Sequence, residues 1–174
     1  ENIHADNIII IPNNKNVLLS AETAAKMIEN QNVFVLAAKT IPQGYAALTM
    51  FDATQDPESN LKDMQRHIKN VKTGEITYAI RESVNNGVKI QKDDFMGIFN
   101  GEIVVSVQNR IEAAKKLLKS MIDKFSEIVT IMFGADVNEE EVNEIVEEVS
   151  EEFPIEVEII NGGQDIYSYI ISVE

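Results

Sequence analysis

Short apolar runs alternate with helix-like segments in the first half of the chain. Each run is five or six residues long and is bounded by polar, proline or glycine residues, which is typical of a buried strand. We predict strands at 7–11, 33–38 and 76–80. Strands that alternate with helices indicate a parallel sheet with helices on its faces. This half therefore predicts a doubly wound α/β lobe.

Three helices are predicted between these strands. Ser20 is a suitable N-cap for the first. Residues 40–44 are interpreted as a turn that leads into a short helix at 45–50. Asp56 and Pro57 are a cap followed by proline at the first helical position, which predicts the third helix. Its apolar face is expected to be Leu61, Met64, Ile68 and Val71.

The pattern changes after residue 87. Asn100-Gly101 lies between two apolar runs within residues 95–107 and favours a tight hairpin, because both residues tolerate positive φ. Asn109 and Asn138 each precede an amphipathic segment and are predicted helix N-caps. Further strands are expected at 128–133, 155–160 and 166–173.

These patterns predict the α/β fold class with two lobes in one domain. The first lobe, 1–88, is expected to hold a mainly parallel sheet flanked by helices. The second, 89–174, is expected to be an α+β sandwich. The chain starts at Glu1 without methionine and enters a strand within a few residues, so we interpret it as one domain of a larger protein.

Charge is unevenly distributed along the chain. There are 15 basic and 29 acidic residues, a net charge of −14, and ten of the glutamates lie between Asn138 and Glu158 with no basic residue among them. Such a surface repels phosphate backbones and anionic lipid head groups, so we expect no nucleic-acid partner. No apolar run approaches the roughly 18 to 20 residues needed to cross a bilayer, so we expect no membrane insertion. The glutamate-rich helix is interpreted as a solvated face, and steering of a partner is the alternative.

The residues offer little catalytic chemistry. Cysteine is absent, which excludes disulfides and thiolate nucleophiles and is compatible with a reducing cytoplasm. His4 and His67 have no ligand-spaced companions, so we expect exposed histidines and no metal site. No glycine-rich run precedes Lys-Ser or Lys-Thr. We therefore predict no catalytic residue, no enzyme activity and no cofactor in this chain.

Two polar loops follow the first two predicted strands. Residues 13–16 follow the first strand, and residues 40–44 follow the second. Open α/β sheets bind their ligands at the carboxyl ends of the strands, so adjacent loops on this rim form a plausible contact surface. The alternative is that both loops only order the chain as turns and helix caps.

Four segments, in order along the chain, resemble a known family. They are Ile11-Pro12-Asn13-Asn14-Lys15-Asn16-Val17, Lys39 to Gly44, Gly74 to Arg81, and Gly162-Gly163-Gln164 through Glu174. Together they resemble the C-terminal region of the large, ATP-binding subunit of bacterial fatty acid kinase, over essentially the whole chain. Asp165 stands where that family usually has proline after Gly-Gly-Gln.

The resemblance implies a multidomain parent. An N-terminal, dihydroxyacetone-kinase-like domain would bind ATP and magnesium, a middle domain would follow, and this domain would come last. The parent would phosphorylate a fatty acid that a separate DegV-family carrier presents, for phospholipid synthesis in the cytoplasm. This domain itself is expected to be DegV-like in fold. DegV carriers hold the carboxylate with loop hydroxyls and a C-terminal histidine, but residues 13–16 contain no serine and residues 155–174 no histidine.

These implications lead to the hypothesis that this non-catalytic domain docks the fatty-acid carrier. The kinase and middle domains of the same chain are further expected partners. The alternatives are a lipid-binding domain in its own right and a dimerisation scaffold. The expected partner-binding residues are Asn13, Asn14, Lys15, Asn16, Thr40, Gln43, Gly44, Arg81 and Gln164.

Overall fold

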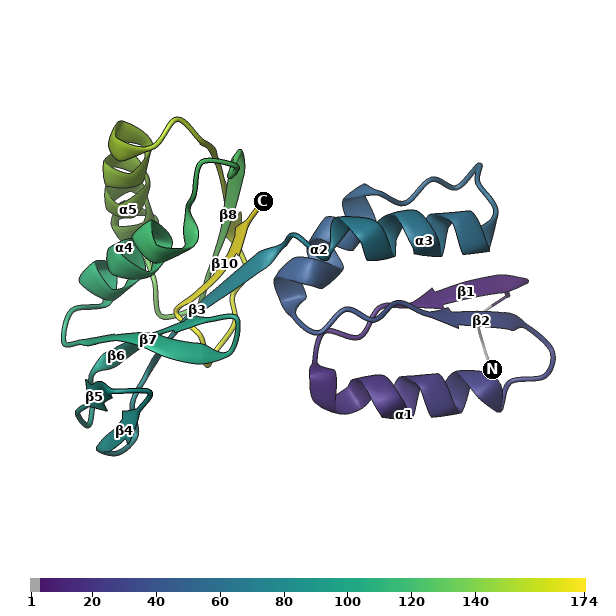
Figure 1. Cartoon of the computed structure of the whole chain (residues 1–174), viewed down its shortest axis with the longest axis horizontal. Coiled ribbons are helices and arrows are strands. Elements are labelled where there is room, and N and C mark those ends of the chain that lie inside the picture. The colour runs from purple at the N-terminus through teal and green to yellow at the C-terminus, as the bar shows by residue number, and fades with distance from the viewer. Residues whose placement is uncertain (1–3) are drawn as a thin grey trace. The chain divides into compact units, whose positions relative to one another are not determined.

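The computed structural model describes residues 4–174, so residues 1–3 of the expected first lobe lie outside the described residues. The chain forms two compact units, Glu1–Val71 and Lys72–Glu174, here called unit 1 and unit 2 (Figure 1). The division falls after Val71 and not after residue 88. The reason is that the strand beginning at Lys72 pairs on both sides with strands of unit 2.

Unit 1 is a two-stranded parallel sheet with helices on both faces (Figure 1). One helix covers one face, and two helices cover the other. The third strand expected in this sheet lies in unit 2 instead, so the doubly wound lobe is smaller than predicted. In chain order the elements are β1 (Asn7–Ile10), α1 (Lys15–Lys26), β2 (Asn32–Val35), α2 (Ile41–Thr49) and α3 (Pro57–His67).

Two helices of unit 1 begin earlier than predicted. Asn14 caps α1, because its side-chain oxygen accepts a hydrogen bond from the Asn16 backbone at 2.8 Å, and Ser20 lies inside the helix. Thr40 caps α2, so residues 41–44 are its first turn and not a separate turn. The cap predicted at Asp56 is confirmed. Its hydrogen bond from Ser59 lowers the pKa of the Asp56 carboxyl.

The core of unit 1 lies on one face of its sheet. Five buried residues of β2, α2, α3 and their flanks form it, and no residue of α1 is buried. Unit 1 therefore packs α1 loosely and leaves many apolar side chains in contact with solvent. The buried residues are Leu36, Ala38, Ala47, Met64 and Ile68.

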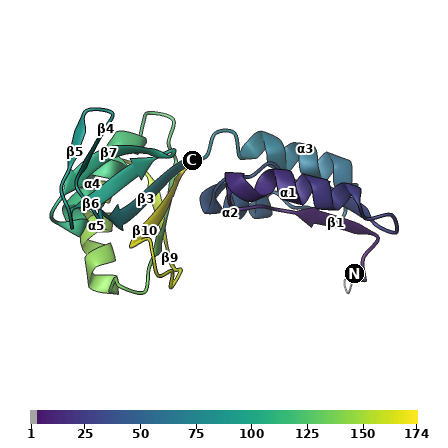
Figure 2. The same cartoon turned by 90° about the horizontal axis from the view of Figure 1, so that it is seen from below.

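Unit 2 is a six-stranded sheet with two helices on one face, as Figures 1 and 2 show. The strand order is β7-β6-β3-β10-β8-β9, and all pairs are antiparallel except β8 with β9. This confirms the α+β second lobe. No helix among the described residues has the length and apolar character needed to span a bilayer. The elements are β3 (Lys72–Tyr78), β4 (Ser83–Asn85), β5 (Val88–Ile90), β6 (Phe95–Phe99), β7 (Glu102–Val107), α4 (Arg110–Met121), β8 (Ile128–Phe133), α5 (Glu139–Glu152), β9 (Glu156–Asn161) and β10 (Tyr169–Val173).

Asparagine-glycine pairs close two hairpins of unit 2. Asn100 and Gly101 join β6 to β7 with φ of 49° and 89°, which confirms the predicted hairpin. Asn86 and Gly87 join β4 to β5 with φ of 47° and 84°, and this second hairpin was not predicted. Positive φ at both central residues is the geometry that matches the twist of paired strands.

The glutamates of α5 are not simply a solvated face. Lys115 of α4 lies 2.8 Å from Glu144 and 2.8 Å from Glu148, and Lys119 contacts Glu148 and Glu152. Lys115 and then Lys119 lower the pKa of the Glu148 carboxyl. Each of these partly exposed pairs contributes little to stability. The buried residues Val142, Ile145 and Val149 of α5 face the core.

One core side chain of unit 2 has an unsatisfied polar atom. Tyr169 of β10 is fully buried, and its hydroxyl has no hydrogen-bond partner among the described residues. Burial, helped by the Glu141 carboxylate, raises the pKa of this hydroxyl. Leaving a buried hydroxyl unpaired costs about 1–3 kcal/mol.

We expect Tyr169→Phe to raise the stability by about 1 kcal/mol, the lower end of this cost, because the substitution removes the unpaired oxygen and keeps the ring. Urea unfolding of both proteins measures the difference. The control is Tyr78→Phe on an exposed tyrosine, which should change nothing. A loss above about 1 kcal/mol would mean that the Tyr169 hydroxyl makes a stabilising contact, such as a bound water.

Candidate functional site

The two predicted loops meet at one edge of unit 1. Because β1 and β2 are parallel, the segments that follow them leave at the same edge. A Cβ built on Gly44 lies 3.4 Å from Cγ2 of Ile11, so the first turn of α2 is in contact with the segment after β1. We call residues 11–16 and 37–44 the rim. It brings together seven of the nine predicted partner-binding residues.

Part of the first rim segment is used to start α1. The Asn14 side chain accepts from the Asn16 backbone, so its oxygen serves the helix. Asn13, Lys15 and Asn16 are exposed. Apart from Asn14, the exposed side chains of residues 13–16 are therefore one cation and two amides.

The second rim segment is similarly tied to the fold. Thr40 caps α2 by accepting from the Gln43 backbone at 3.3 Å. The Gln43 side-chain oxygen accepts from the Lys39 backbone at 2.8 Å, and its nitrogen donates to the Ile68 carbonyl at 3.5 Å. Gly44 is buried. Thr40, Gln43 and Gly44 consequently hold the rim in shape.

The other two predicted residues lie in unit 2. Arg81 is exposed in the bend between β3 and β4. The Gln164 side chain donates to the Met132 carbonyl at 3.0 Å, and the Gln164 carbonyl accepts from the Ala135 backbone at 3.0 Å. Gln164 thus orders the loop before β10.

An exposed apolar stripe on α2 was missed by the sequence analysis. Ile41, Tyr45 and Leu48 recur at helical spacing, and their exposed fractions are 40%, 37% and 60%. Their neighbours Ala46 and Ala47 face the core. The stripe begins at the rim with Ile41 and ends near Phe51, which is 52% exposed. An apolar stripe that faces away from its own core is a feature of interaction surfaces.

An apolar groove of about 380 Å³ lies at the far end of this stripe. Side chains of β1, of the α2–α3 connection and of α3 form its walls. The Asn60 side chain in its wall is engaged with the Asp52 backbone, donating to the carbonyl at 2.6 Å and accepting from the amide at 2.9 Å. The groove therefore offers apolar contact without a charged anchor. The residues that line it are Asn7, Ile9, Ile11, Leu48, Phe51, Ala53, Gln55, Pro57, Asn60 and Met64.

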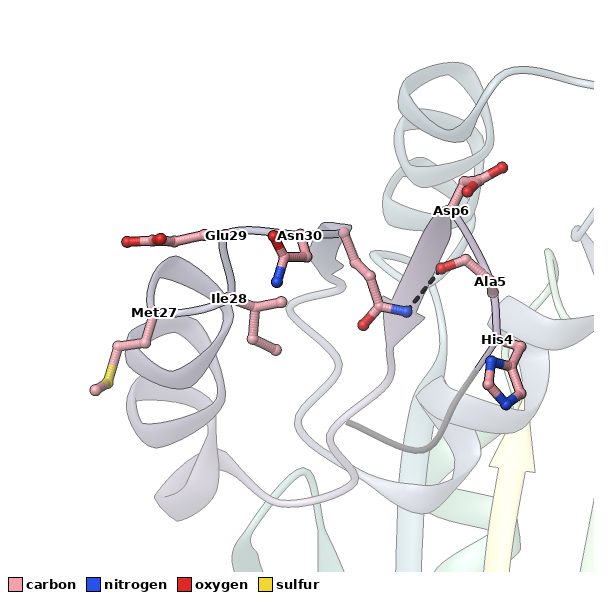
Figure 3. A pocket seen from close by; sticks show the side chains of 8 residues that line it. His4, Ala5, Asp6, Met27, Ile28, Glu29 and Asn30 are labelled. Carbon is pink, nitrogen blue, oxygen red and sulfur yellow. Dashed lines mark hydrogen bonds between the residues drawn. The ribbon is translucent and has the colours of Figure 1, made fainter.

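A wide polar hollow of about 890 Å³ lies at the opposite edge of the sheet (Figure 3). Residues 4–6, which lead into β1, and residues 27–31, which connect α1 to β2, line it. The Gln31 side chain donates to the Ala5 carbonyl at 2.8 Å across it, as the dashed line in Figure 3 marks. It contains no predicted site residue. Across residues 4–174, no three His, Asp or Glu side chains are grouped to hold a metal.

Solved structures of DegV proteins resemble this chain closely in fold. The Streptococcus pneumoniae fatty acid kinase B3 protein, solved with linoleic acid, matches 98% of this chain and 72% of its own with a TM-score of 0.68 and 13% identity. The dihydroxyacetone kinase of C. freundii matches 95% of this chain and 38% of its own, with a TM-score of 0.58 and 14% identity. At such identities the likeness shows the fold alone, and that fold is DegV-like.

Sequence relatives identify the family. Protein YloV of Bacillus subtilis is 44% identical over 175 aligned positions, which cover the whole chain and 32% of that protein. An uncharacterised protein of Staphylococcus epidermidis is 40% identical over 167 positions, 95% of this chain and 30% of its own. The chain thus spans about a third of the length of these relatives. Residues 1–174 match the C-terminal family of FakA-like fatty acid kinase subunits, and the chain belongs to this family.

Proposed function

We propose that this domain docks a DegV-family fatty-acid carrier, so that the bound fatty acid is phosphorylated on another domain of the parent protein. ATP and magnesium belong to an N-terminal kinase domain in this proposal, and the acyl phosphate serves phospholipid synthesis in the cytoplasm. Membership of the FakA-like C-terminal family supports it. A carrier must shield the acyl chain from water while its carboxylate meets ATP, so the kinase needs a surface that grips the carrier.

The exposed stripe on α2 is the observation that carries this proposal. Ile41, Tyr45 and Leu48 present apolar area beside the rim, where Lys15 and Asn16 add polar groups. An apolar centre with a polar border is the usual arrangement of a protein interface. Large apolar side chains at the centre supply most of the binding energy. In this proposal Asn14, Thr40 and Gln43 contribute to docking indirectly. Their side chains bond to the backbone at the starts of α1 and α2 and so hold the rim in shape.

The alternative, in which this domain binds lipid itself, would place the acyl chain in the apolar groove of unit 1. The groove beside the stripe is apolar, but its lining includes no charged side chain and the Asn60 amide is engaged with Asp52. A fatty-acid carboxylate would have no anchor there. We therefore expect purified chain to retain no long-chain fatty acid, and mass spectrometry of the denatured protein tests this.

Calorimetric titration of the carrier into this chain tests docking. We expect micromolar binding and a loss of at least about tenfold in Leu48→Asp, because a carboxylate at the centre of an apolar contact must be desolvated. Leu19→Asp is the matched control, since Leu19 is 73% exposed on α1, outside the rim and the stripe. It should bind the carrier as the unaltered chain does.

Two results would count against docking by this surface. Absence of heat and of co-elution at tens of micromolar protein would show that this domain does not dock the carrier alone. If Leu48→Asp and the unaltered chain bind the carrier with equal affinity, the carrier does not contact the stripe on α2.

A further inference from the structure

Strand β9 of unit 2 has a hydrogen-bonding side that no other strand uses. Within the part of the chain that the structure describes, β9 pairs with β8 alone. The backbones of Glu156 and Gly162 donate hydrogen bonds of 2.9 and 3.0 Å toward β8. Successive residues of a strand direct their N–H and C=O groups to opposite sides. Val157, Ile159 and Asn161 therefore direct both groups away from the sheet.

The backbone of β9 does nothing to block this edge. The strand is six residues long, contains neither proline nor glycine, and pairs with β8 in one continuous register. A long, regular edge of this kind is a template for a further strand. The strand at the other end of the sheet, β7, differs, because its pairing with β6 is irregular and β5 contacts it.

Acidic side chains line one face of the β9 edge. Glu156 and Glu158 alternate along the strand opposite Ile128 and Thr130 of β8. The residues between them in β8 and β9 belong to the core under the helices, so the two carboxylates lie on the other face of the sheet. Among the described residues neither carboxylate has a basic partner, whereas the glutamates of α5 that face α4 are paired with lysines.

The opposite face of the same edge is apolar. Val157 packs against the core between sheet and helices. Ile159, two residues further along on the same face, is 42% exposed. A strand added beside β9 would cover Ile159 with every second side chain. The edge therefore fits a segment that is apolar on one face and complementary to carboxylates on the other.

The charges exclude a second copy of β9 and favour a basic strand as the occupant. Two β9 edges would bring the glutamates of both together, and like charges opposite each other destabilise a sheet. A strand with lysine or arginine at alternate positions would instead place cations opposite both carboxylates. Residues 72–174 hold 21 acidic and nine basic residues, so unit 2 also attracts a basic segment from a distance.

We propose that β9 accepts an extended, basic segment of a partner protein as a seventh strand of the sheet in unit 2. The segment alternates basic with apolar residues. Its cations lie opposite Glu156 and Glu158, its apolar side chains cover Ile159, and its backbone bonds to the free side of β9. This inference does not depend on the proposed carrier docking, which uses unit 1.

A synthetic peptide tests this edge directly. The probe is the capped peptide Thr-Lys-Val-Lys-Val-Lys-Thr, and the same peptide with glutamate in place of lysine is its control. One short strand buries less area than a typical stable complex, so we expect a dissociation constant of about 10–100 µM at low salt. The affinity should fall at least about threefold at about 0.3 M salt. In nuclear magnetic resonance spectra of the whole chain, the amide signals of Val157, Ile159 and Asn161 should shift most. The glutamate peptide should not bind.

Two variants alter the edge in different ways. The double variant Glu156→Lys, Glu158→Lys should bind the lysine peptide at least about tenfold more weakly and should bind the glutamate peptide instead. Ile159→Pro removes an outward N–H but leaves the bonds from β9 to β8 intact, and should also weaken binding at least about tenfold. The matched control is Glu82→Lys, Glu102→Lys, which makes the same change in net charge at exposed residues outside β8 and β9. It should bind the lysine peptide within about twofold of the unaltered chain.

Circular dichroism and thermal unfolding establish that each variant is folded, and the Glu156→Lys, Glu158→Lys variant decides if Ile159→Pro unfolds. No binding of the lysine peptide at about 1 mM overturns the proposal. So do amide shifts that lie outside β9, and so does an equal loss of affinity in the charge-matched control, which would show attraction to the acidic chain as a whole. Loss of binding in the β9 variants, with retention in the control, supports it.

Discussion

Gly134→Ala is expected to destabilise unit 2 by about 3 kcal/mol, which lowers its melting temperature by roughly 15 °C. Gly134 follows β8, and its backbone N–H donates to the Ser168 carbonyl at 2.9 Å. A Cβ at this position would lie 2.5 Å from the Tyr167 carbonyl oxygen and 2.7 Å from that of Gln164. Both atoms belong to backbone, so no side-chain rotation can relieve the collision.

The collision separates two segments that the fold holds together. The loop from residue 162 to residue 168 is tied to the end of β8 through the hydrogen bonds of Gln164 to Met132 and Ala135. Moving the loop away from a new methyl group breaks these bonds and leaves buried carbonyls unpaired. Ala135→Ser, at the exposed neighbouring residue, is the control and should cost less than about 0.5 kcal/mol. A loss below about 1 kcal/mol in Gly134→Ala would show that the loop adapts freely.

Local chemistry explains which elements could be predicted from the sequence. The caps at Asp56, Asn109 and Asn138 and the Asn100-Gly101 hairpin are all confirmed. Each is specified within about four residues, because a cap bonds to the backbone two or three positions ahead and a hairpin turn is set by its own φ angles. Such features need no knowledge of the rest of the fold.

Competition between nearby caps, and pairing between distant strands, could not be resolved from the sequence. Ser20 is a good cap by residue type, but Asn14 stands earlier at a chain reversal after Pro12, and the helix begins there. The strand that begins at Lys72 follows α3 along the chain, as a third strand of the unit 1 sheet would. Its partners, however, are β6 and the distant β10, and no local pattern indicates that pairing.

The wrong start of α2 is also the reason why the apolar part of the candidate site was not predicted. Dividing α2 into a turn and a short helix separated Ile41 from Tyr45 and Leu48, so their common face was not recognised. The polar rim residues were placed together correctly, because parallel strands end at the same edge. The hydrogen bonds within the rim could not be foreseen from residue type. They engage the side chains of Thr40 and Gln43, whereas Asn13, Lys15 and Asn16 stay exposed.

Leu117→Ala is the second substitution with a large expected effect, a loss of about 3–5 kcal/mol in the stability of unit 2. Leu117 of α4 is fully buried in the core between helix and sheet. It packs over two glycines of neighbouring strands. A Cβ on Gly74 would lie 3.1 Å from Leu117 Cδ2, and a Cβ on Gly97 would lie 3.3 Å from Leu117 Cβ. Because Gly74 and Gly97 have no side chains, α4 packs close to the backbone of the sheet at this point.

The two glycines are the reason why we expect a loss of stability at the upper end of the range for Leu→Ala substitutions. When a buried leucine is truncated, neighbouring side chains usually move into part of the cavity and reduce the cost. Gly74 and Gly97 have no side chains that could do so, and the sheet backbone is held by β10, β3, β6 and β7. Urea unfolding measures the loss, with Lys116→Ala, on the exposed side of the same helix, as a control expected to cost less than about 0.5 kcal/mol. A loss of under about 2 kcal/mol in Leu117→Ala would mean that Met121, which also lies over Gly74, swings into the space, and the double substitution with Met121→Ala would then cost more than the sum of the two single ones.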